Sequence, residues 1–205
     1  MPRQRFGNLD ESKQKEILNA AFEEFAENGF EAASLNRIIE KASLSKGALY
    51  YYFEDKADLY FAVVEQAMHS MLDSFGEIPD LAGPEEFWTV LGGKISEYAR
   101  QSVEDPRHMA LLKSTAALLN QGTTHPMLRK IRDTWFEHMA AIGRKGQVVG
   151  AVRKDIPFDL LMAVIYGMDI GADMWAAENW DRVPDEQKIS YGRTILEMIR
   201  RVAQP

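Results

Sequence analysis

Hydrophobic residues recur at helical spacing along most of the chain. Leu35, Ile38, Ile39 and Ala42 fall at i, i+3, i+4 and i+7, which places them on one face of a helix. Similar patterns predict helices near 10–28, 35–42, 46–52, 56–75, 84–103, 106–121, 126–148, 157–178 and 184–203. The sequence contains no convincing strand pattern, repeat or low-complexity tract, so we expect an all-α fold of about nine helices.

Capping residues and prolines support these helix boundaries. Ser34 and Ser45 are good N-caps for the second and third helices, and Gly29 can end the first helix in the left-handed conformation. Five prolines fall in the first turn of a predicted helix, where the missing N–H is harmless: Pro84, Pro106, Pro126, Pro157 and Pro184.

The second and third predicted helices are short, and the turn Ser43-Leu44-Ser45 joins them. Two helices joined in this way form a helix-turn-helix, whose second helix can enter the major groove of DNA. Lys46 places a cation near the start of that second helix. Gly47 and Ala48 have almost no side chain, so the backbone can lie close to base edges or phosphates.

Three consecutive tyrosines, Tyr50 to Tyr52, follow on the same helix. Their hydroxyls can donate to phosphates and their rings can pack on sugars or thymine methyls. A packed aromatic helix is the alternative, but three consecutive helical residues cannot all face inward. Asn36, on the exposed side of the preceding helix, can pair with adenine, and Lys56 can reach the DNA backbone. The predicted DNA contacts are Ser34, Asn36, Arg37, Ser45, Lys46, Gly47, Ala48, Tyr50, Tyr51, Tyr52 and Lys56.

The segment from Ile17 to Glu65 resembles the N-terminal domain of TetR-type transcriptional repressors. The matching pieces are Ala20-Ala21-Phe22, Phe25-Ala26-Glu27-Asn28-Gly29-Phe30, Ser34, Ile38-Ile39, Ala42, Leu44-Ser45-Lys46-Gly47 and Leu49-Tyr50-Tyr51-Tyr52-Phe53, with Lys56, Leu59 and Tyr60. Two positions depart from the family pattern. Ser43 stands where the family usually has glycine, and we expect it to cost some turn stability. Ala48 stands where threonine is frequent, and it lacks a hydroxyl that relatives can use on DNA.

The resemblance implies a helix-turn-helix DNA-binding domain at 1–55 and a helical effector-binding and dimerisation domain at 56–205, with 56–75 as the connecting helix. It also implies a homodimer that binds a palindromic operator in double-stranded DNA. We therefore predict a sequence-specific transcriptional regulator, acting as a repressor that a small-molecule effector releases. The alternative is a helical small-molecule-binding protein or an enzyme without DNA binding.

Two C-terminal helices are predicted to form the dimer interface. The helix from Pro157 is apolar on almost every side, and Gly167 and Gly171 would let another helix approach closely. The last helix is amphipathic. The predicted interface residues are Gly167, Gly171, Trp175, Ile195, Leu196 and Ile199. The alternative is that both helices serve a core within one chain.

The middle helices should enclose a largely apolar effector, as the resemblance implies. The residues predicted to line its site are Trp88, Tyr98, His108, Met109, Trp135, Met139, Tyr166 and Asp169. Aromatic and methionine side chains line apolar pockets, although at helical spacing each is also typical of a core. Asp169 and Asp173 are four residues apart on an apolar helix, and a buried carboxylate needs a partner. That partner can be a cationic ligand, a metal, an arginine or a tyrosine.

Composition narrows the function further. The chain has 24 Lys and Arg against 31 Asp and Glu, and its net charge of −7 suits an acidic body with a small basic reading surface. The absence of cysteine excludes disulfides and thiolate chemistry and fits a cytoplasmic protein. Catalytic motifs, phosphate loops and zinc-ligand spacings are missing, so we expect no enzyme, cofactor or metal site. We also expect no secretory signal and no membrane-spanning helix. Arg3 and Arg5 form either a minor-groove arm or a disordered terminus.

Overall fold

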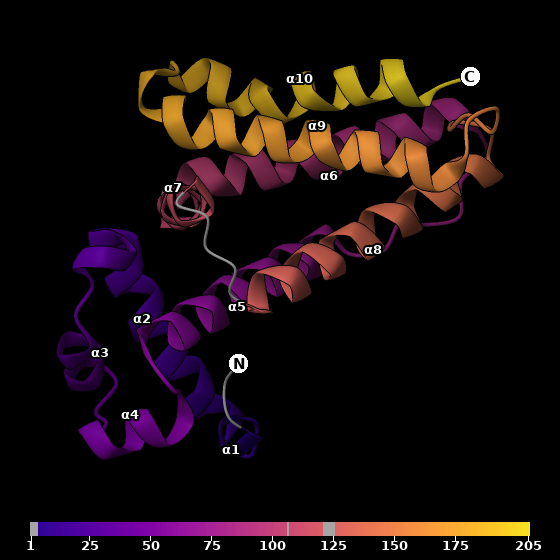
Figure 1. The fold of residues 1–205 in the computed structure, drawn as a ribbon. Helices are drawn as coiled ribbons and strands as arrows, with labels where there is room; N and C mark the ends of the chain where they lie inside the picture. Colours follow the sequence, from indigo (N-terminus) through magenta and orange to yellow (C-terminus); the bar gives the residue numbers. More distant parts are fainter. Residues whose placement is uncertain (1–3, 106, 121–125) are drawn as a thin grey trace. The chain divides into compact units, whose positions relative to one another are not determined.

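The computed structural model describes residues 4–105, 107–120 and 126–205, and these contain helices and no strand. Figure 1 shows their order along the chain. The helices are α1 (Gln4–Gly7), α2 (Glu11–Ala32), α3 (Leu35–Lys41), α4 (Lys46–Tyr52), α5 (Lys56–Phe75), α6 (Pro84–Glu104), α7 (Arg107–Asn120), α8 (Pro126–Val148), α9 (Phe158–Asn179), the 3₁₀ turn η1 (Trp180–Arg182) and α10 (Asp185–Ala203). The predicted all-α fold is therefore confirmed.

The predicted helices agree with the observed ones to within a few residues, apart from two short elements. Within α2, Gly29 has φ +68°, so the left-handed break falls where the sequence predicted it. The two short elements, α1 and η1, were not predicted. In α1, Phe6 is buried and packs on Phe53 with 4.8 Å between ring centroids. The predicted helix start at Pro106 lies outside the described residues, as does Arg3.

The chain forms two compact units. Unit 1 consists of Met1–Ser70 and Arg107–Ile131, and unit 2 of Met71–Pro106 and Arg132–Pro205. This division differs from the predicted boundary between residues 55 and 56, because most of α5, all of α7 and the start of α8, up to Ile131, belong to unit 1. The chain passes from one unit to the other within α5, between α6 and α7, and within α8.

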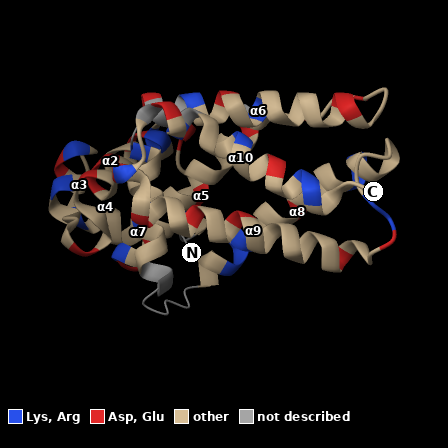
Figure 2. Cartoon of the chain, turned by 90° about the horizontal axis from the view of Figure 1, so that it is seen from above, with Lys and Arg blue, Asp and Glu red and all other residues tan. Residues whose placement is uncertain are grey.

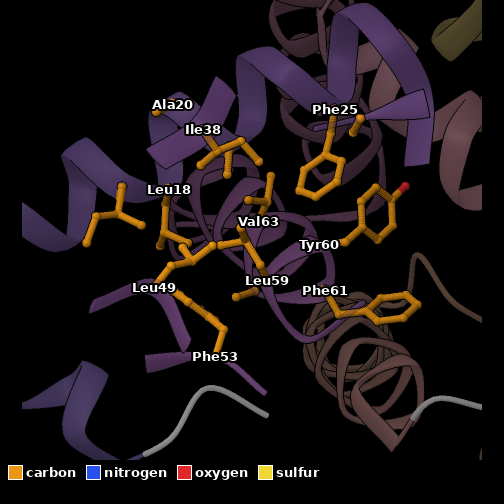
Figure 3. Close-up of a cluster of buried hydrophobic side chains, with 14 of the residues drawn as sticks. Leu18, Ala20, Phe25, Ile38, Leu49, Phe53, Leu59, Tyr60, Phe61 and Val63 are labelled. Atoms are coloured by element: carbon orange, nitrogen blue, oxygen red, sulfur yellow. The ribbon is translucent and has the colours of Figure 1, made fainter. Parts of the chain in front are cut away.

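Unit 1 has a core to which each helix of the helix-turn-helix contributes. Figure 3 shows Phe25, Ile38, Leu49, Phe53 and Tyr60 as members of this cluster, and each of them is 0 or 1% exposed. Burying a large apolar side chain stabilises a fold by roughly 1.5–3 kcal/mol. These contacts fix the orientation of α3 and α4 from behind, so the opposite faces of both helices remain on the surface.

Helix α7 completes unit 1 although it lies some fifty residues beyond the helix-turn-helix in the sequence. It packs along α2 and contributes the buried Leu111 to the core. Ser114 Oγ accepts a hydrogen bond from Phe30 N at 3.1 Å, and the Tyr60 hydroxyl lies 2.8 Å from Thr115 Oγ1. Burial raises the pKa of Tyr60. The DNA-binding unit is thus held together by a segment from the middle of the chain.

Unit 2 is built from α6, most of α8, α9 and α10 around a separate core that includes Phe87, Leu161 and Met162. Gly146 is required there, because a Cβ on it would lie 2.5 Å from Val152 Cγ2. On α10, Leu196 is 8% and Ala203 1% exposed, and both belong to this core. Helix α10 packs along α6 and more lightly on α9, so much of the α9 surface is left without cover within its own chain.

Candidate nucleic-acid interface and effector site

The N-termini of α3 and α4 are formed by the two predicted serine caps. Ser34 Oγ accepts from Arg37 N at 3.4 Å, and Ser45 Oγ accepts from Ala48 N at 3.1 Å. Each hydroxyl thereby satisfies one of the backbone donors that a helix start leaves unpaired. Both serines therefore shape the helix-turn-helix, whatever further contacts they make.

The turn between α3 and α4 depends on a left-handed residue. Ser43 has φ +48°, which makes it the non-glycine residue with positive φ in the described part of the chain. Its N–H donates to Glu40 O at 3.1 Å, and Leu44 N donates to Ile39 O at 2.9 Å. An L-residue in this conformation costs roughly 1–2 kcal/mol. The strain lies at the position where the resemblance led us to expect glycine.

Helix α4 presents a polar and aromatic face to solvent. Lys46 and Gly47 are exposed, and the side chains of Tyr50 and Tyr51 are 42% and 47% exposed. The Arg5 guanidinium lies 4.5 Å from the centroid of the Tyr51 ring, so α1 adds a cation to this face.

Two other residues of α4 face partly inward. Tyr52 is half-buried and contacts the Phe6 ring edge-on at 5.9 Å between centroids. Ala48 is also half-buried. Of the three tyrosines, two are therefore on the surface, which agrees with the argument that three consecutive helical residues cannot all face the core.

Helix α3 is positioned by a buried carboxylate that the sequence analysis missed. Glu24, on α2, is 7% exposed, and its carboxylate accepts from Arg37 Nε at 2.9 and 3.0 Å and from Ser34 N at 2.7 Å. The bonds from Arg37 and from Ser34 hold the pKa of Glu24 below its usual value. Arg37, predicted to contact DNA, is thus first a structural partner of Glu24, whereas Asn36 beside it is exposed.

Lys56 also has a structural role, because its ammonium group binds backbone carbonyls. Its Nζ donates to Glu31 O at 2.9 Å and to Ala33 O at 3.4 Å, and it lies 4.9 Å from the centroid of the Phe30 ring. These contacts tie the start of α5 to the segment between α2 and α3. The ammonium group is engaged by protein carbonyls, so we assign Lys56 to positioning rather than to the predicted phosphate contact.

Basic and acidic residues are interspersed on the helices around the helix-turn-helix (Figure 2), and several of the cations there form ion pairs with acids. On α3, Lys41 pairs with Glu23, whose other oxygen lies 3.8 Å from Arg107. Lys46 has no ion-pair partner in the described part of the chain. The exposed positive charge on the recognition face therefore comes from Lys46 and Arg5.

The predicted effector residues are divided between the two units. His108 and Met109 lie on α7 in unit 1, where the His108 ring packs 5.5 Å from Phe22. The other predicted residues belong to unit 2. Trp88 and Met139 contribute to the core there, and Tyr98 is half-buried on α6. Trp88, for example, is 6% exposed and contacts the Phe87 ring at 5.0 Å.

Trp135 and Asp169 are in direct contact in unit 2. The indole Nε1 donates to Asp169 Oδ2 at 2.7 Å, which joins α8 to α9. Arginine and tyrosine were the protein partners predicted for this carboxylate, and the observed partner is a tryptophan instead. Trp135 also stacks on His138, with ring centroids 5.9 Å apart and planes at 17°. Among the described residues, no group of three or more His, Cys, Asp or Glu is arranged to hold a metal ion.

The electrostatics of this region are unusual. Burial raises the pKa of Asp169, and the bond from Trp135 opposes that shift. Burial and the charge of Asp169 together raise the pKa of Asp173 to about 7. Tyr191, which sequence reasoning missed, has its pKa raised to about 12 by burial and by both carboxylates. Its hydroxyl donates to Ala172 O at 2.5 Å.

One side of α9 forms an exposed apolar stripe, defined here as Leu160, Val164, Gly167, Gly171 and Trp175. These positions are spaced by three or four residues, which places them on one helix face. Leu160 is 55% and Trp175 48% exposed, and a Cβ built on either glycine would meet nothing within 4 Å. This geometry is compatible with the predicted interface.

The predicted interface on α10 needs correction. Leu196 is buried in the core of its own unit, and Ile199 packs against the same core. Their side chains are therefore occupied within the chain, and Leu196 is withdrawn as an interface residue. Ile195 is half-buried, and Met198 nearby is 50% exposed. The amphipathic pattern of α10 reflects its packing on α6.

By length and composition alone, Phe158–Arg182 is apolar enough to cross a membrane, and it is the one such helix among the described residues. The expectation that no helix spans a membrane stays a prediction, because an apolar helix of a soluble protein can meet the same two criteria. Little of this stretch is buried within the chain, so the apolar surface of α9 calls for cover by something else.

Comparison with known proteins identifies similar sequences along most of the chain. The profile of "Bacterial regulatory proteins, tetR family" matches residues 17–63. The HTH-type transcriptional regulator UidR of Escherichia coli K12 is 30% identical over 174 residues, which cover 79% of this chain and 83% of UidR. The HTH-type transcriptional repressor AcnR of Corynebacterium glutamicum is 25% identical over 162 residues, covering 76% and 77% of the two chains.

Solved structures agree with this assignment. A TetR-family transcriptional regulator from Pectobacterium atrosepticum has 26% identity and a TM-score of 0.69, with 96% of this chain and 94% of that chain covered. FadR from Bacillus subtilis, in complex with stearoyl-CoA, has the same fold at 20% identity, with a TM-score of 0.68 and 90% and 96% of the chains covered.

These relatives are regulators and not enzymes, which confirms the prediction of a DNA-binding transcriptional regulator. Regulators of this kind are soluble, act as dimers, and bind DNA and small-molecule effectors. With a match in the helix-turn-helix and a relative at 30% identity over most of its length, this chain belongs to the tetR family of bacterial regulatory proteins.

Proposed function

We propose that the protein is a transcriptional repressor that binds a palindromic operator as a homodimer and leaves it when a small-molecule effector binds. The observation that carries the proposal is the exposed face of α4, where Lys46, Tyr50 and Tyr51 lie together on the second helix of a helix-turn-helix. The name of the AcnR relatives supports repression. A repressor of chromosomal genes works in the cytoplasm.

The contacts with DNA divide into two classes. Asn36 is exposed near the start of α3, and we assign it to base reading, because its amide can pair bidentately with adenine. Lys46, Tyr50 and Tyr51 are assigned to phosphates, which fix the position of the protein on the duplex. Gly47 has no side chain to hold the backbone of α4 away from the DNA.

The homodimer is proposed to form through the exposed apolar stripe of α9. A soluble protein does not leave such a surface open, and a second copy offers an equally apolar surface to cover it. Two-fold symmetry would present two α4 helices to successive major grooves, about 34–36 Å apart for adjacent half-sites. An effector that prefers a different spacing lowers operator affinity in proportion to its preference.

The experiment is an anisotropy titration of fluorescent DNA from upstream of the protein's own gene, with scrambled DNA as competitor. We expect a salt-sensitive specific complex, and Lys46→Ala should weaken binding and reduce the salt slope by about one unit per contact. Lys154→Ala, an exposed lysine in unit 2, is the matched control and should bind as the parent does.

Asn36→Ala should behave differently from Lys46→Ala. We expect it to lose about 1–3 kcal/mol of discrimination at one operator position while its salt slope stays unchanged. Equal binding of the parent to operator and scrambled DNA would overturn the regulator assignment and favour a ligand-binding protein without DNA specificity.

A further inference from the structure

Unit 2 contains a group of acidic and aromatic side chains from three helices, called here the acidic-aromatic cluster. Its members are Trp135 and His138 on α8, Tyr166, Asp169 and Asp173 on α9, and Tyr191 on α10. Trp135 contacts Asp169 directly, and both tyrosines lie close enough to feel the charge of the two carboxylates. We propose that this cluster binds an organic ammonium ion with apolar substituents, for which Asp173 and Asp169 provide the counter-charge.

Positive charge is missing around the two carboxylates of the cluster. The charged residues of α9 are Asp159, Asp169, Asp173 and Glu178, all of them acidic. Asp169 accepts one hydrogen bond, from Trp135, and no hydrogen bond or ion pair to Asp173 occurs among the described residues. Buried carboxylates are normally paired, because removing an unpaired charge from water is very unfavourable.

Neighbouring basic groups do not provide the missing charge. Arg132 lies near Tyr166, but its guanidinium is bound to Asp133 Oδ1 at 2.7 and 3.0 Å. Burial lowers the pKa of His138, so the imidazole is neutral at neutral pH and compensates neither carboxylate. The acids therefore lack an internal counter-ion in the part of unit 2 that the structure describes.

The second argument is a buried polar atom without a partner. His138 Nε2 is inaccessible to solvent and makes no hydrogen bond with the described residues. Its ring is held between Phe75, at 6.2 Å and nearly perpendicular, and Trp135, at 5.9 Å and nearly parallel. Native proteins rarely leave such an atom unsatisfied. A ligand that carries a hydroxyl or amide beside its cationic centre would satisfy it once the side chains that cover Nε2 move aside.

The third argument concerns the chemical class of the ligand. The rings of Trp135, Tyr166 and Tyr191 accompany the carboxylates, and aromatic faces attract ammonium ions that have lost their water. A metal ion is disfavoured, because the described residues provide no set of three suitable ligands. An apolar ammonium ion uses both features of the cluster, the negative charge and the aromatic surface.

The proposal rests on the proposed function, since it specifies the effector. The probes are tetramethylammonium, choline and benzyltrimethylammonium, with 3,3-dimethylbutan-1-ol as the uncharged counterpart of choline. Binding to the full-length protein without DNA is followed by calorimetry and by tryptophan fluorescence. We expect affinity to rise with the apolar size of the cation, and choline to bind at least ten times more tightly than the alcohol.

The variants are Asp173→Asn and Asp169→Asn, with Asp159→Asn, an exposed acid on the same helix, as the matched control. We expect at least a tenfold loss of cation affinity for Asp173→Asn and none for the control. Circular dichroism establishes that each variant is folded, and Asp169→Asn provides a second measurement should Asp173→Asn unfold. If no cation prefers the parent over both variants, the acids are a protonated structural pair and the proposal is overturned.

The outcome is separable from that of the proposed function. Operator binding of the parent and of both variants is measured in the absence of cations. Specific DNA binding without any cation preference would overturn the cluster as a site and leave the repressor standing. Cation binding without specific DNA binding would support the cluster as a site and overturn the repressor. Release of the operator by benzyltrimethylammonium, lost in Asp173→Asn, would support both.

Discussion

Glu24 in unit 1 and the two half-buried acids of α9 in unit 2 have contrasting environments. In unit 1, Glu24 is bound by Arg37 and by the backbone of Ser34, and its pKa is lowered. In unit 2, Asp169 has one neutral donor and Asp173 has none among the described residues, and both pKa values are raised. A carboxylate whose hydrogen bonds are all made within the protein holds its surroundings in one conformation. A carboxylate without such donors is stabilised when a ligand provides them. The contrast fits a rigid reading surface and a ligand-responsive body.

The apolar surfaces show the same contrast. In unit 1, the exposed aromatic residues of the helix-turn-helix, Tyr50 and Tyr51, belong to the proposed DNA face. In unit 2, the apolar stripe of α9 is exposed to solvent, although none of the residues that define it has a charged side chain. We infer that unit 2 is completed by a second copy of the chain and by a ligand, and unit 1 by DNA.

The largest effect is expected from a substitution in the α9 stripe that prevents a second helix from approaching. Gly171→Leu places a large side chain where another helix would approach, and it should disrupt the dimer without disturbing the fold, because nothing lies within 4 Å of the new Cβ. Operator affinity should fall at least about 100-fold, since one α4 helix then binds alone, a loss of about 2.7 kcal/mol. Sedimentation velocity and operator titration measure the two effects.

Gly93→Leu on α6 is the control for that variant, because its Cβ also meets open space. It should remain a dimer and keep its operator affinity. A dimeric Gly171→Leu protein would place the interface away from this stripe and would weaken the contrast between the two units.

The next prediction concerns Glu24, the acid of unit 1 that is hydrogen-bonded by Arg37 and Ser34. Glu24→Ala leaves the Ser34 N–H without its acceptor and Arg37 without its partner. We expect a loss of about 1–3 kcal/mol in the free energy of unfolding, toward the lower end because Arg37 is largely solvated. Urea denaturation measures it, with the exposed Glu31→Ala as control. Equal stability of both variants would show that Glu24 does not hold α3 in place.

Replacing Asp173, the acid of unit 2 that has no hydrogen-bonding partner among the described residues, should raise stability at neutral pH, whereas replacing Glu24 should lower it. The folded-state pKa of Asp173 is raised from 3.8 to about 7, so ionisation opposes folding, and the parent loses stability as pH rises from about 4 to about 7. Asp173→Asn does not ionise there. Its melting temperature should exceed that of the parent at pH 8, by the equivalent of at least about 1.4 kcal/mol, and the difference should shrink at pH 5.

His138 also makes stability depend on pH, so the comparison between parent and variant isolates the contribution of Asp173. His138, with its lowered pKa, makes both proteins less stable as pH falls below about 6.5, and that contribution cancels in the comparison. A difference in melting temperature that is the same at pH 5 and pH 8 would show that the pKa of Asp173 is not raised in the folded protein.

Local features of this fold could be predicted from the sequence, and long-range pairings could not. Helix periodicity, the caps Ser34 and Ser45 and the break at Gly29 involve residues within a few positions of one another, and the structure has each of them. Helix α1 was missed because four residues are too short to show a period.

Pairings between helices carry no such local signal. Glu24 and Arg37 are 13 residues apart, and Trp135 and Asp169 are 34 apart. The sequence marked Asp169 as a residue in need of a partner, but tertiary packing decided that the partner is a tryptophan. Leu196 was misassigned for a related reason, since an amphipathic pattern does not distinguish a core within one chain from an interface between two.

The smallest expected effect concerns the turn that fixes the reading surface of unit 1. Ser43 is held at φ +48°, and glycine adopts this region without the clash of a Cβ. Ser43→Gly should therefore raise the free energy of unfolding, by at most about 1 kcal/mol, because the greater freedom of glycine in the unfolded chain offsets part of the gain. Ser43→Ala is the control that keeps the Cβ, and it should not be stabilised. Urea denaturation of the three proteins decides, and a destabilised Ser43→Gly would mean that the serine side chain stabilises the turn by more than its backbone strain costs.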